Sequence, residues 1–262
     1  MALLRVFLRS LGFILILSSY SIVSTIIYIS FGFNFEKARP YLVHVISIAS
    51  KYGLKVFNVE VRKTFAPIDP SENFLIVSNH LTYLDVLIIS THFPTSFVTS
   101  QEMKETPFLG QICLLGGCLF VERRKRSGLA NEVKELSNAL VEGINVAIFP
   151  EATSTNGEAV IRFKRPLFQA AMSSHSKILP VCLNYRTLDG EKITLKNRDS
   201  VFWYDDTPFI KHVLRLFSHK KIVAEFSVMS PIDTSTFVDK SDLAEHCYNL
   251  IGQEFEAITH AV

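Results

Sequence analysis

The stretch FLIVSNHLTYLD, residues 74–85, contains an apolar run, a short polar segment and the start of a second apolar run. Residues 74–77 have the length and composition of a buried strand, and residues 86–89 continue as a helix. His80 lies in the polar turn, and Asp85 opens the helix. Such a turn lets the carboxylate reach one imidazole nitrogen and leaves the other nitrogen free to accept a proton. A surface histidine followed by a carboxylate at a helix N-terminus is the alternative.

Segments of strand and helix character alternate from residue 54 to the C-terminus. This alternation is typical of an α/β protein with a mostly parallel central sheet flanked by helices. Ligands bind at the carboxyl ends of strands in such sheets, so we expect the polar turns after the strands to form the site. We expect strands at residues 55–62, 74–77, 96–99, 118–121, 146–149, 178–183 and 222–228, and helices at residues 86–93, 129–140, 165–173 and 242–258.

The N-terminal part of the chain has the features of a membrane segment. Residues 11–33 contain no charged residue, and a helix of this length can cross a bilayer. Basic residues stand on both sides, so charge does not fix the orientation. No small-residue cleavage site ends the run, which disfavours a signal peptide, whereas an interfacial helix pair with residues 41–49 is an alternative to spanning. We expect membrane-anchoring helices at residues 1–52 and one α/β domain at residues 53–262.

Composition excludes several classes of protein. A net charge of +2 over 262 residues is too small to indicate nucleic-acid binding, and an apolar content of 48% favours a membrane protein. The histidines form no ligand pair on one helix face near a carboxylate, so we expect no metal. Four scattered cysteines indicate reduced thiols in a protein that faces the cytosol: Cys113, Cys118, Cys182 and Cys247.

Three further apolar segments also run into polar or glycine-containing turns. Residues 117–123 end in an acid and a guanidinium, Arg123. Residues 149–157 carry Glu151 and three hydroxyls, and an apolar strand around Pro180 is interrupted by that proline. Taken singly, Arg123 could be part of a solvated run of charges and Glu151 a helix cap. Their recurrence after a membrane segment favours one shared site.

The order and spacing of these blocks resemble those of the glycerolipid acyltransferase family, and the resemblance covers about residues 74–181. The best-known members convert 1-acyl-sn-glycerol-3-phosphate to phosphatidic acid. The family's Asn-His-x4-Asp block is matched by Asn79, His80 and Asp85, its Gly-x-x-Phe-x-x-Arg block by Gly117, Phe120 and Arg123, its Phe-Pro-Glu-Gly-Thr block by Phe149, Pro150, Glu151 and Thr153, and its apolar-Pro-apolar strand by Pro180.

This resemblance implies a membrane-bound enzyme, with its catalytic domain facing the cytoplasm, that moves an acyl chain from acyl-CoA or acyl carrier protein to the free hydroxyl of a lysolipid. His80 would be the general base and Asp85 its orienting carboxylate. Arg123 would bind the acceptor phosphate or another anionic group of the headgroup, and Glu151 would orient the acceptor or Arg123. We expect no cofactor and no acyl-enzyme, since no Gly-x-Ser-x-Gly motif is present.

The other matched residues are expected to help bind substrate, and backbone donors in the turn after the first strand to stabilise the oxyanion. These other residues are Asn79, Gly117, Phe120 and Thr153.

Two residues depart from the family pattern. Ala152 replaces the usual glycine, so positive φ is less accessible at that position. Ser154 stands where many members that form phosphatidic acid have an arginine, which weakens the assignment of a glycerol-phosphate acceptor. Three basic residues that follow are either a substitute for that charge or solvated residues at a helix start: Arg162, Lys164 and Arg165.

Three alternatives therefore remain at this stage. The acceptor is another lysolipid, such as a lyso-amino-acid lipid; the chain is a non-catalytic lipid-binding protein; or water replaces the acceptor and the chain is a thioesterase.

A late amphipathic stripe follows the aromatic and acidic segment 203–206. We expect it to pack in the core, and a second bilayer contact or a wall of the acyl pocket is the alternative. The stripe consists of Ile210, Val213, Leu214 and Phe217.

Overall fold

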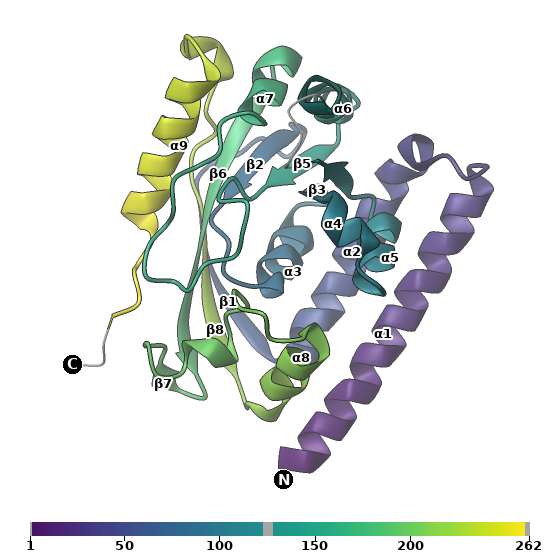
Figure 1. Ribbon diagram of the computed structural model, residues 1–262, viewed down its shortest axis with the longest axis vertical. Helices are drawn as coiled ribbons and strands as arrows, with labels where there is room; N and C mark the ends of the chain where they lie inside the picture. The colour runs from purple at the N-terminus through teal and green to yellow at the C-terminus, as the bar shows by residue number, and fades with distance from the viewer. Residues whose placement is uncertain (1, 123–127, 260–262) are drawn as a thin grey trace.

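The computed structural model of the chain describes residues 2–122 and 128–259, and in this part β2 occupies the middle of an eight-stranded sheet (Figure 1). All five residues of β2 are buried. The strand order is β1-β8-β6-β2-β5-β3-β4, and β7 pairs with β6. The strands are β1 (Val59–Phe65), β2 (Phe74–Ser78), β3 (Thr95–Ser100), β4 (Leu119–Val121), β5 (Asn145–Ile148), β6 (Lys177–Leu188), β7 (Glu191–Lys192) and β8 (Ile222–Val228).

The predicted fold, with a mostly parallel sheet, is confirmed. Strands β2 to β6 are parallel to one another, whereas β8 is antiparallel to β6 and β1 is parallel to β8. The expected strand at residues 55–62 is wrong at its start, because residues up to Phe57 belong to a helix. Asn58 ends that helix in the left-handed conformation, and its N–H donates to the carbonyls of Leu54 and Lys55.

Helices cover both faces of the sheet, which gives three layers. On one face, α2, α3 and α8 contribute apolar residues to one core cluster, and on the other, α6, α7 and α9 contribute to a second. The helices are α1 (Ala2–Ser30), α2 (Phe35–Phe57), α3 (Tyr83–His92), α4 (Gln101–Glu105), α5 (Leu109–Leu115), α6 (Leu129–Val141), α7 (Phe168–Ser174), α8 (Phe209–Ser218) and α9 (Lys240–Glu254), with single 3-10 turns η2 (Arg198–Ser200) and η3 (Thr234–Thr236).

Residues 11–30 of the N-terminal apolar run lie within α1, and residues 31–33 form the turn that follows. Helix α1 forms a helical hairpin with α2 beside the α/β domain (Figure 1). By length and composition α1 could cross a membrane, and it is the one such helix in the described part of the chain. The boundary expected at residue 52 falls inside α2, which continues to Phe57.

Helix α1 lies against the domain along its length. Near its start, Arg5 donates a hydrogen bond to the carbonyl of Ser218 at the end of α8. In its middle, the Phe13 ring meets the Phe217 ring of α8 edge-on, with 5.7 Å between centroids. Further along, the Tyr20 hydroxyl donates to the carbonyl of Ile112 on α5 at 2.7 Å. The opposite face of α1 is apolar and exposed.

Candidate active site

The turn after β2 folds back onto the start of α3, and Asp85 holds it in place. Thr82 caps α3, and Asp85 is the third residue of the helix. Its Oδ2 accepts hydrogen bonds from the backbone N–H groups of Leu81 at 2.6 Å and Thr82 at 2.9 Å. The positive end of the helix dipole also favours a carboxylate here. These local interactions explain why Asp85 is fully buried.

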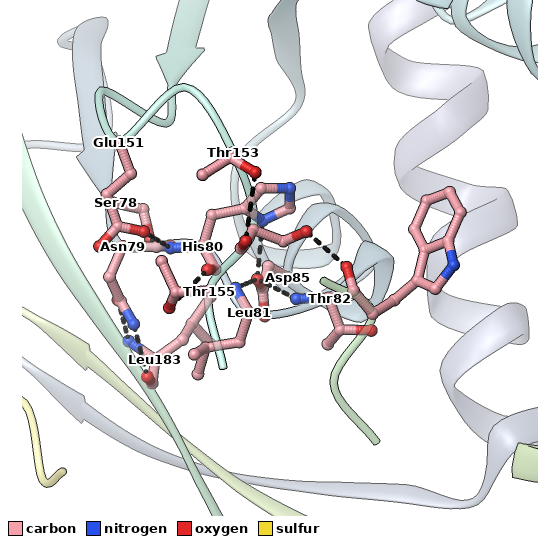
Figure 2. Close-up of polar contacts among 12 residues, drawn as sticks. Ser78, Asn79, His80, Leu81, Thr82, Asp85, Glu151, Thr153, Thr155 and Leu183 are labelled. Atoms are coloured by element: carbon pink, nitrogen blue, oxygen red, sulfur yellow. Dashed lines mark hydrogen bonds and ion pairs between the residues drawn. The ribbon is translucent and has the colours of Figure 1, made fainter. Parts of the chain in front are cut away.

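The predicted contact between His80 and Asp85 is present (Figure 2). His80 Nδ1 lies 2.9 Å from Asp85 Oδ2. Because an ionised carboxylate can only accept, Nδ1 carries the hydrogen and Nε2 presents a lone pair. Nε2 has no hydrogen-bond partner among the described residues, and the side chain is 21% exposed. The imidazole is therefore arranged to take a proton from a group that approaches Nε2.

The turn after β5 holds the backbone and the ring of His80. The His80 N–H donates to Glu151 Oε2 at 3.0 Å, and its carbonyl accepts from the Thr155 N–H at 2.9 Å (Figure 2). The Phe149 ring stacks on the imidazole with 4.0 Å between centroids. Two turns that are about 70 residues apart in the sequence thus fix one histidine.

Glu151 is a buried carboxylate that binds backbone N–H groups. It is 2% exposed, and its second oxygen, Oε1, accepts from the Ile161 N–H at 3.2 Å. Burial raises the pKa of Glu151 to about 8, although the two backbone donors favour the charged form. Glu151 does not border the cavity described below, so what the structure shows is a carboxylate that positions His80.

The Asn79 side chain joins β2 to β6. Its amide donates to the Leu183 carbonyl and accepts from the Leu183 N–H, both at 2.9 Å. This pair continues the β2–β6 ladder one step beyond the last strand pair, Ser78 with Val181. Both polar groups of the Asn79 side chain are therefore used by the backbone of β6, and the residue is buried.

The Gly-x-x-Phe-x-x-Arg block lies at β4, which two strands, β5 and β3, separate from β2. Gly117 has φ +75°, and a Cβ there would lie 3.2 Å from Arg39 Cγ, so glycine meets both a backbone and a packing requirement. Phe120 is half-buried on β4, with Lys104 Nζ 5.3 Å from its ring centroid. Neither borders the cavity. Arg123 lies outside the described residues.

The loop after β5 shows both departures from the family pattern. Ala152 adopts φ +62°, so the positive φ expected to be costly for alanine does occur. The Ser154 hydroxyl donates to the Trp203 carbonyl, and the Trp203 N–H donates to the Leu81 carbonyl at 3.0 Å. Thr153 is exposed and borders the cavity.

The three basic residues considered as a substitute for the missing arginine point elsewhere. Arg162 pairs with Glu245 of α9 at 3.4 Å. Lys164 and Arg165 are exposed, and none of the three borders the cavity.

An apolar cavity of about 410 Å³ opens beside His80. This volume lies in the usual range of small-molecule sites. Its walls come from α1, α2, α3 and α5, for example Leu17, Ala49, Leu87 and Ile112, and His80, Thr153 and Ser154 border it as well. The arrangement combines a long apolar wall with one basic nitrogen, which suits a substrate with a hydrocarbon chain and a reacting polar group.

Sequence reasoning missed two residues of this site. The Tyr185 hydroxyl donates to Asp85 Oδ1 at 2.7 Å, and Trp203 borders the cavity. Tyr185 follows Leu183 by two positions, so a longer β6 would have placed the two on one face. Nothing in the sequence alone places Trp203 beside Leu81. Helices α4 and α5 were also missed.

Comparisons with known proteins match the chain to acyltransferases. A family profile described as Acyltransferase matches residues 56–184. The 1-acyl-sn-glycerol-3-phosphate acyltransferase of Neisseria gonorrhoeae is 29% identical over 180 residues, which are 69% of this chain and 68% of that protein. The lyso-ornithine lipid O-acyltransferase of Brucella abortus is 25% identical over 225 residues, 83% of this chain and 82% of that protein.

A solved structure shows the same fold. The crystal structure of the 1-acyl-sn-glycerophosphate (LPA) acyltransferase of Thermotoga maritima superposes with a TM-score of 0.68 over 97% of this chain and 96% of that one, at 18% identity. The family profile and these relatives support the assignment of the chain to the glycerolipid acyltransferase family.

Proposed function

We propose that the chain is a membrane-bound lysolipid O-acyltransferase that transfers an acyl chain from a thioester, acyl-CoA or acyl carrier protein, to the free hydroxyl of a lysolipid. The observation that carries this proposal is the His80–Asp85 pair at 2.9 Å, with Nε2 unpartnered among the described residues, beside an apolar cavity. The cavity holds the hydrocarbon chain, and the pair activates the hydroxyl.

His80 Nε2 takes the proton of the acceptor hydroxyl while the oxygen attacks the thioester carbonyl. Asp85 keeps the tautomer and stabilises the imidazolium that forms. When the tetrahedral intermediate collapses, the carbon–sulfur bond breaks and the imidazolium returns the proton to the leaving thiolate. No protein nucleophile takes part, so the reaction needs no acyl-enzyme.

The oxyanion donors lie in the turn after β5 rather than the turn after β2. In the β2 turn the N–H groups of His80, Leu81 and Thr82 already donate to Glu151 and Asp85, which argues against the earlier expectation. The N–H groups of Thr153 and Ser154 have no acceptor among the described residues, and both residues border the cavity. Two adjacent backbone donors are a usual way to stabilise such an anion.

Helix α1 anchors the enzyme in one leaflet rather than across the bilayer, with the catalytic domain in the cytoplasm. A helix held at its start by contacts to α8 and further along by contacts to α5 cannot also leave the domain to span. Its outward face presents apolar side chains for the acyl region of a membrane. These exposed residues are Leu3, Leu4, Phe7, Leu8, Leu11, Ile14, Leu15, Ile22, Val23, Ile26 and Ile29.

Helix α8 extends this lipid-facing surface. Val213 and Phe217 of the amphipathic stripe are buried as expected, whereas Ile210 and Leu214 are 54% and 43% exposed. Since α8 packs beside α1, these two side chains and the exposed Lys211 would meet the membrane surface together. The neighbouring Phe209 borders the cavity, so the cavity lies close to this surface.

The preferred acceptor is 1-acyl-sn-glycerol-3-phosphate, as in the Neisseria relative, and the product is phosphatidic acid. Arg123 would bind its phosphate, with Gly117 and Phe120 shaping the strand that leads to it. A second candidate is an acceptor without a phosphate monoester, such as the lyso-ornithine lipid named for the Brucella relative. It is favoured because Ser154, in the position of the missing arginine, uses its hydroxyl on the Trp203 carbonyl.

One assay separates these possibilities. Membranes containing the chain are incubated with labelled oleoyl- or palmitoyl-CoA, or with the acyl carrier protein thioesters, and a panel of lysolipids, and the products are identified by mass. We expect phosphatidic acid as the main product. Preference for a phosphate-free lysolipid would favour the second acceptor, free fatty acid released without a lysolipid would indicate a thioesterase, and no product with any pair would contradict the proposal.

A further inference from the structure

Tyr185 donates the one hydrogen bond that reaches Asp85 Oδ1 from the described residues. Its hydroxyl lies 2.7 Å from Oδ1, whereas the other three donors, two backbone N–H groups and the imidazole, all lie on Oδ2. Tyr185 is 6% exposed and does not border the cavity. It therefore touches the carboxylate but no substrate in that cavity.

The register of β6 places Tyr185 at this position. The Asn79 side chain fixes Leu183 opposite the end of β2, and Tyr185 follows two residues later on the same face of the strand. The β6–β8 register shifts directly after Tyr185, so Tyr185 is the last residue before the irregularity. The Phe202 ring, edge-on at 5.7 Å, packs against the phenol ring.

We propose that Tyr185 is a positioning residue for acyl transfer, whose hydroxyl anchors Oδ1 of the Asp85 carboxylate and sets the basicity of His80. Three donors already hold Oδ2, and the Tyr185 hydroxyl is the donor that anchors Oδ1. The same donor draws negative charge toward Oδ1 and away from the imidazole. Burial, together with the nearby Asp85 carboxylate, raises the pKa of Tyr185, which keeps the hydroxyl protonated as a donor.

The test is Tyr185→Phe, which removes the donor and keeps the ring. We expect kcat to fall by about 10- to 100-fold, within the usual contribution of a well-placed general base, and KM for both substrates to stay unchanged. Because more negative charge then faces the imidazole, the acidic limb of the kcat/KM profile should move up by about 0.5 to 1 pH unit. A limb that stays in place or moves down, or kcat within about twofold of the starting enzyme, would overturn the proposal.

Tyr248→Phe is the matched control. Its hydroxyl donates to the Val160 carbonyl at 3.4 Å, away from Asp85, so this variant should change neither kcat nor the limb. In a His80→Ala background, Tyr185→Phe should cause no further loss, because a residue that acts through His80 has nothing left to act on. If Tyr185→Phe lowers kcat as much in the His80→Ala background as it does alone, Tyr185 has a structural role and the proposal is overturned.

The inference rests on the proposed function, and one readout works without it. Diethyl pyrocarbonate modifies neutral imidazole, so the extent of modification of the His80 peptide against pH, followed by mass spectrometry, reports the basicity of His80 directly. We expect the midpoint to be higher in Tyr185→Phe than in Tyr248→Phe. If the chain transfers no acyl group but the midpoint moves, the proposed function fails and the link from Tyr185 to His80 stands; an unmoved midpoint overturns the link itself.

Discussion

The turn after β2 and the turn after β5 each bury a carboxylate beside His80, and they use it differently. Asp85 has four hydrogen-bond donors, including one imidazole and one phenol, and it contacts the side chain of His80. Glu151 has two donors, both backbone N–H groups, and it contacts the backbone of His80. The first carboxylate acts on the reacting ring, and the second acts on the position of that ring.

The number of donors explains this difference. A buried carboxylate is costly unless hydrogen bonds replace its water. Asp85 lies at the N-terminus of a helix, and four donors replace the water around its carboxylate. Glu151 has fewer donors, so burial dominates and its pKa rises to about 8. Two acidic residues of one motif set are thus suited to different tasks by their surroundings.

The largest effect should come from removing the base. His80→Ala deletes the nitrogen that takes the proton, so kcat should fall by about 100- to 10,000-fold. The measurement is initial rate with saturating thioester and lysolipid. His175→Asn, which changes a histidine at the left-handed C-cap of α7, is the control and should retain normal turnover. Near-normal rates in His80→Ala would remove this residue from the mechanism.

The next effect sharpens the comparison between the two carboxylates. Asp85→Asn leaves a neutral amide that no longer stabilises the imidazolium, so kcat should fall by about 100-fold or more. Glu151→Gln keeps a side-chain oxygen that accepts from the His80 backbone N–H, so its kcat should fall by no more than about tenfold. The measurement is kcat of both variants from steady-state kinetics at one pH. Equal losses would mean that both carboxylates act on the reacting ring.

Glu151 should also make stability depend on pH. Its pKa is 4.5 as a free side chain and about 8 in the fold, so between these values the folded chain binds more protons than the unfolded chain. This contribution to the free energy of unfolding is complete below about pH 4.5 and is lost as pH rises through about 8. The midpoint of thermal unfolding in detergent should therefore decline over this range.

Two variants test that decline. Glu151→Gln cannot ionise, so its unfolding midpoint should decline less between the same pH values. Glu142→Gln, which changes an exposed glutamate at the end of α6, should retain the full decline. If the unfolding midpoint falls equally with pH in Glu151→Gln and in the unmodified chain, Glu151 stays charged in the fold.

The smallest effect is expected at Ala152, in the loop of Glu151. Ala152→Gly relieves the left-handed backbone, which costs a non-glycine residue about 1–2 kcal/mol, but glycine also loses about 0.4–1 kcal/mol through the greater freedom of the unfolded chain. We expect a net stabilisation of up to about 1 kcal/mol, measured by thermal unfolding. Ala130→Gly on the exposed face of α6 is the control and should destabilise by about 0.5–1 kcal/mol.

Local patterns predicted most of the architecture. Strands β2, β3, β5 and β8 were expected close to their observed positions, because apolar runs between turn residues mark buried strands. The end of α2 was misplaced, because residues 59–62 alternate in polarity as a strand does and the expected strand was extended back over residues 55–57, which continue the helix. Helices α4 and α5 were missed because both are short.

The sequence by itself predicted the contact between His80 and Asp85, because their spacing across a strand, a turn and the start of a helix lets the carboxylate reach the imidazole. Only the tertiary structure decided that Glu151 holds the backbone of His80, that Tyr185 completes the shell of Asp85, and that α1 lies along the domain as a wall of the cavity. Each of these depends on segments distant in the chain, and their meeting is set by sheet order and strand register, which no local pattern encodes.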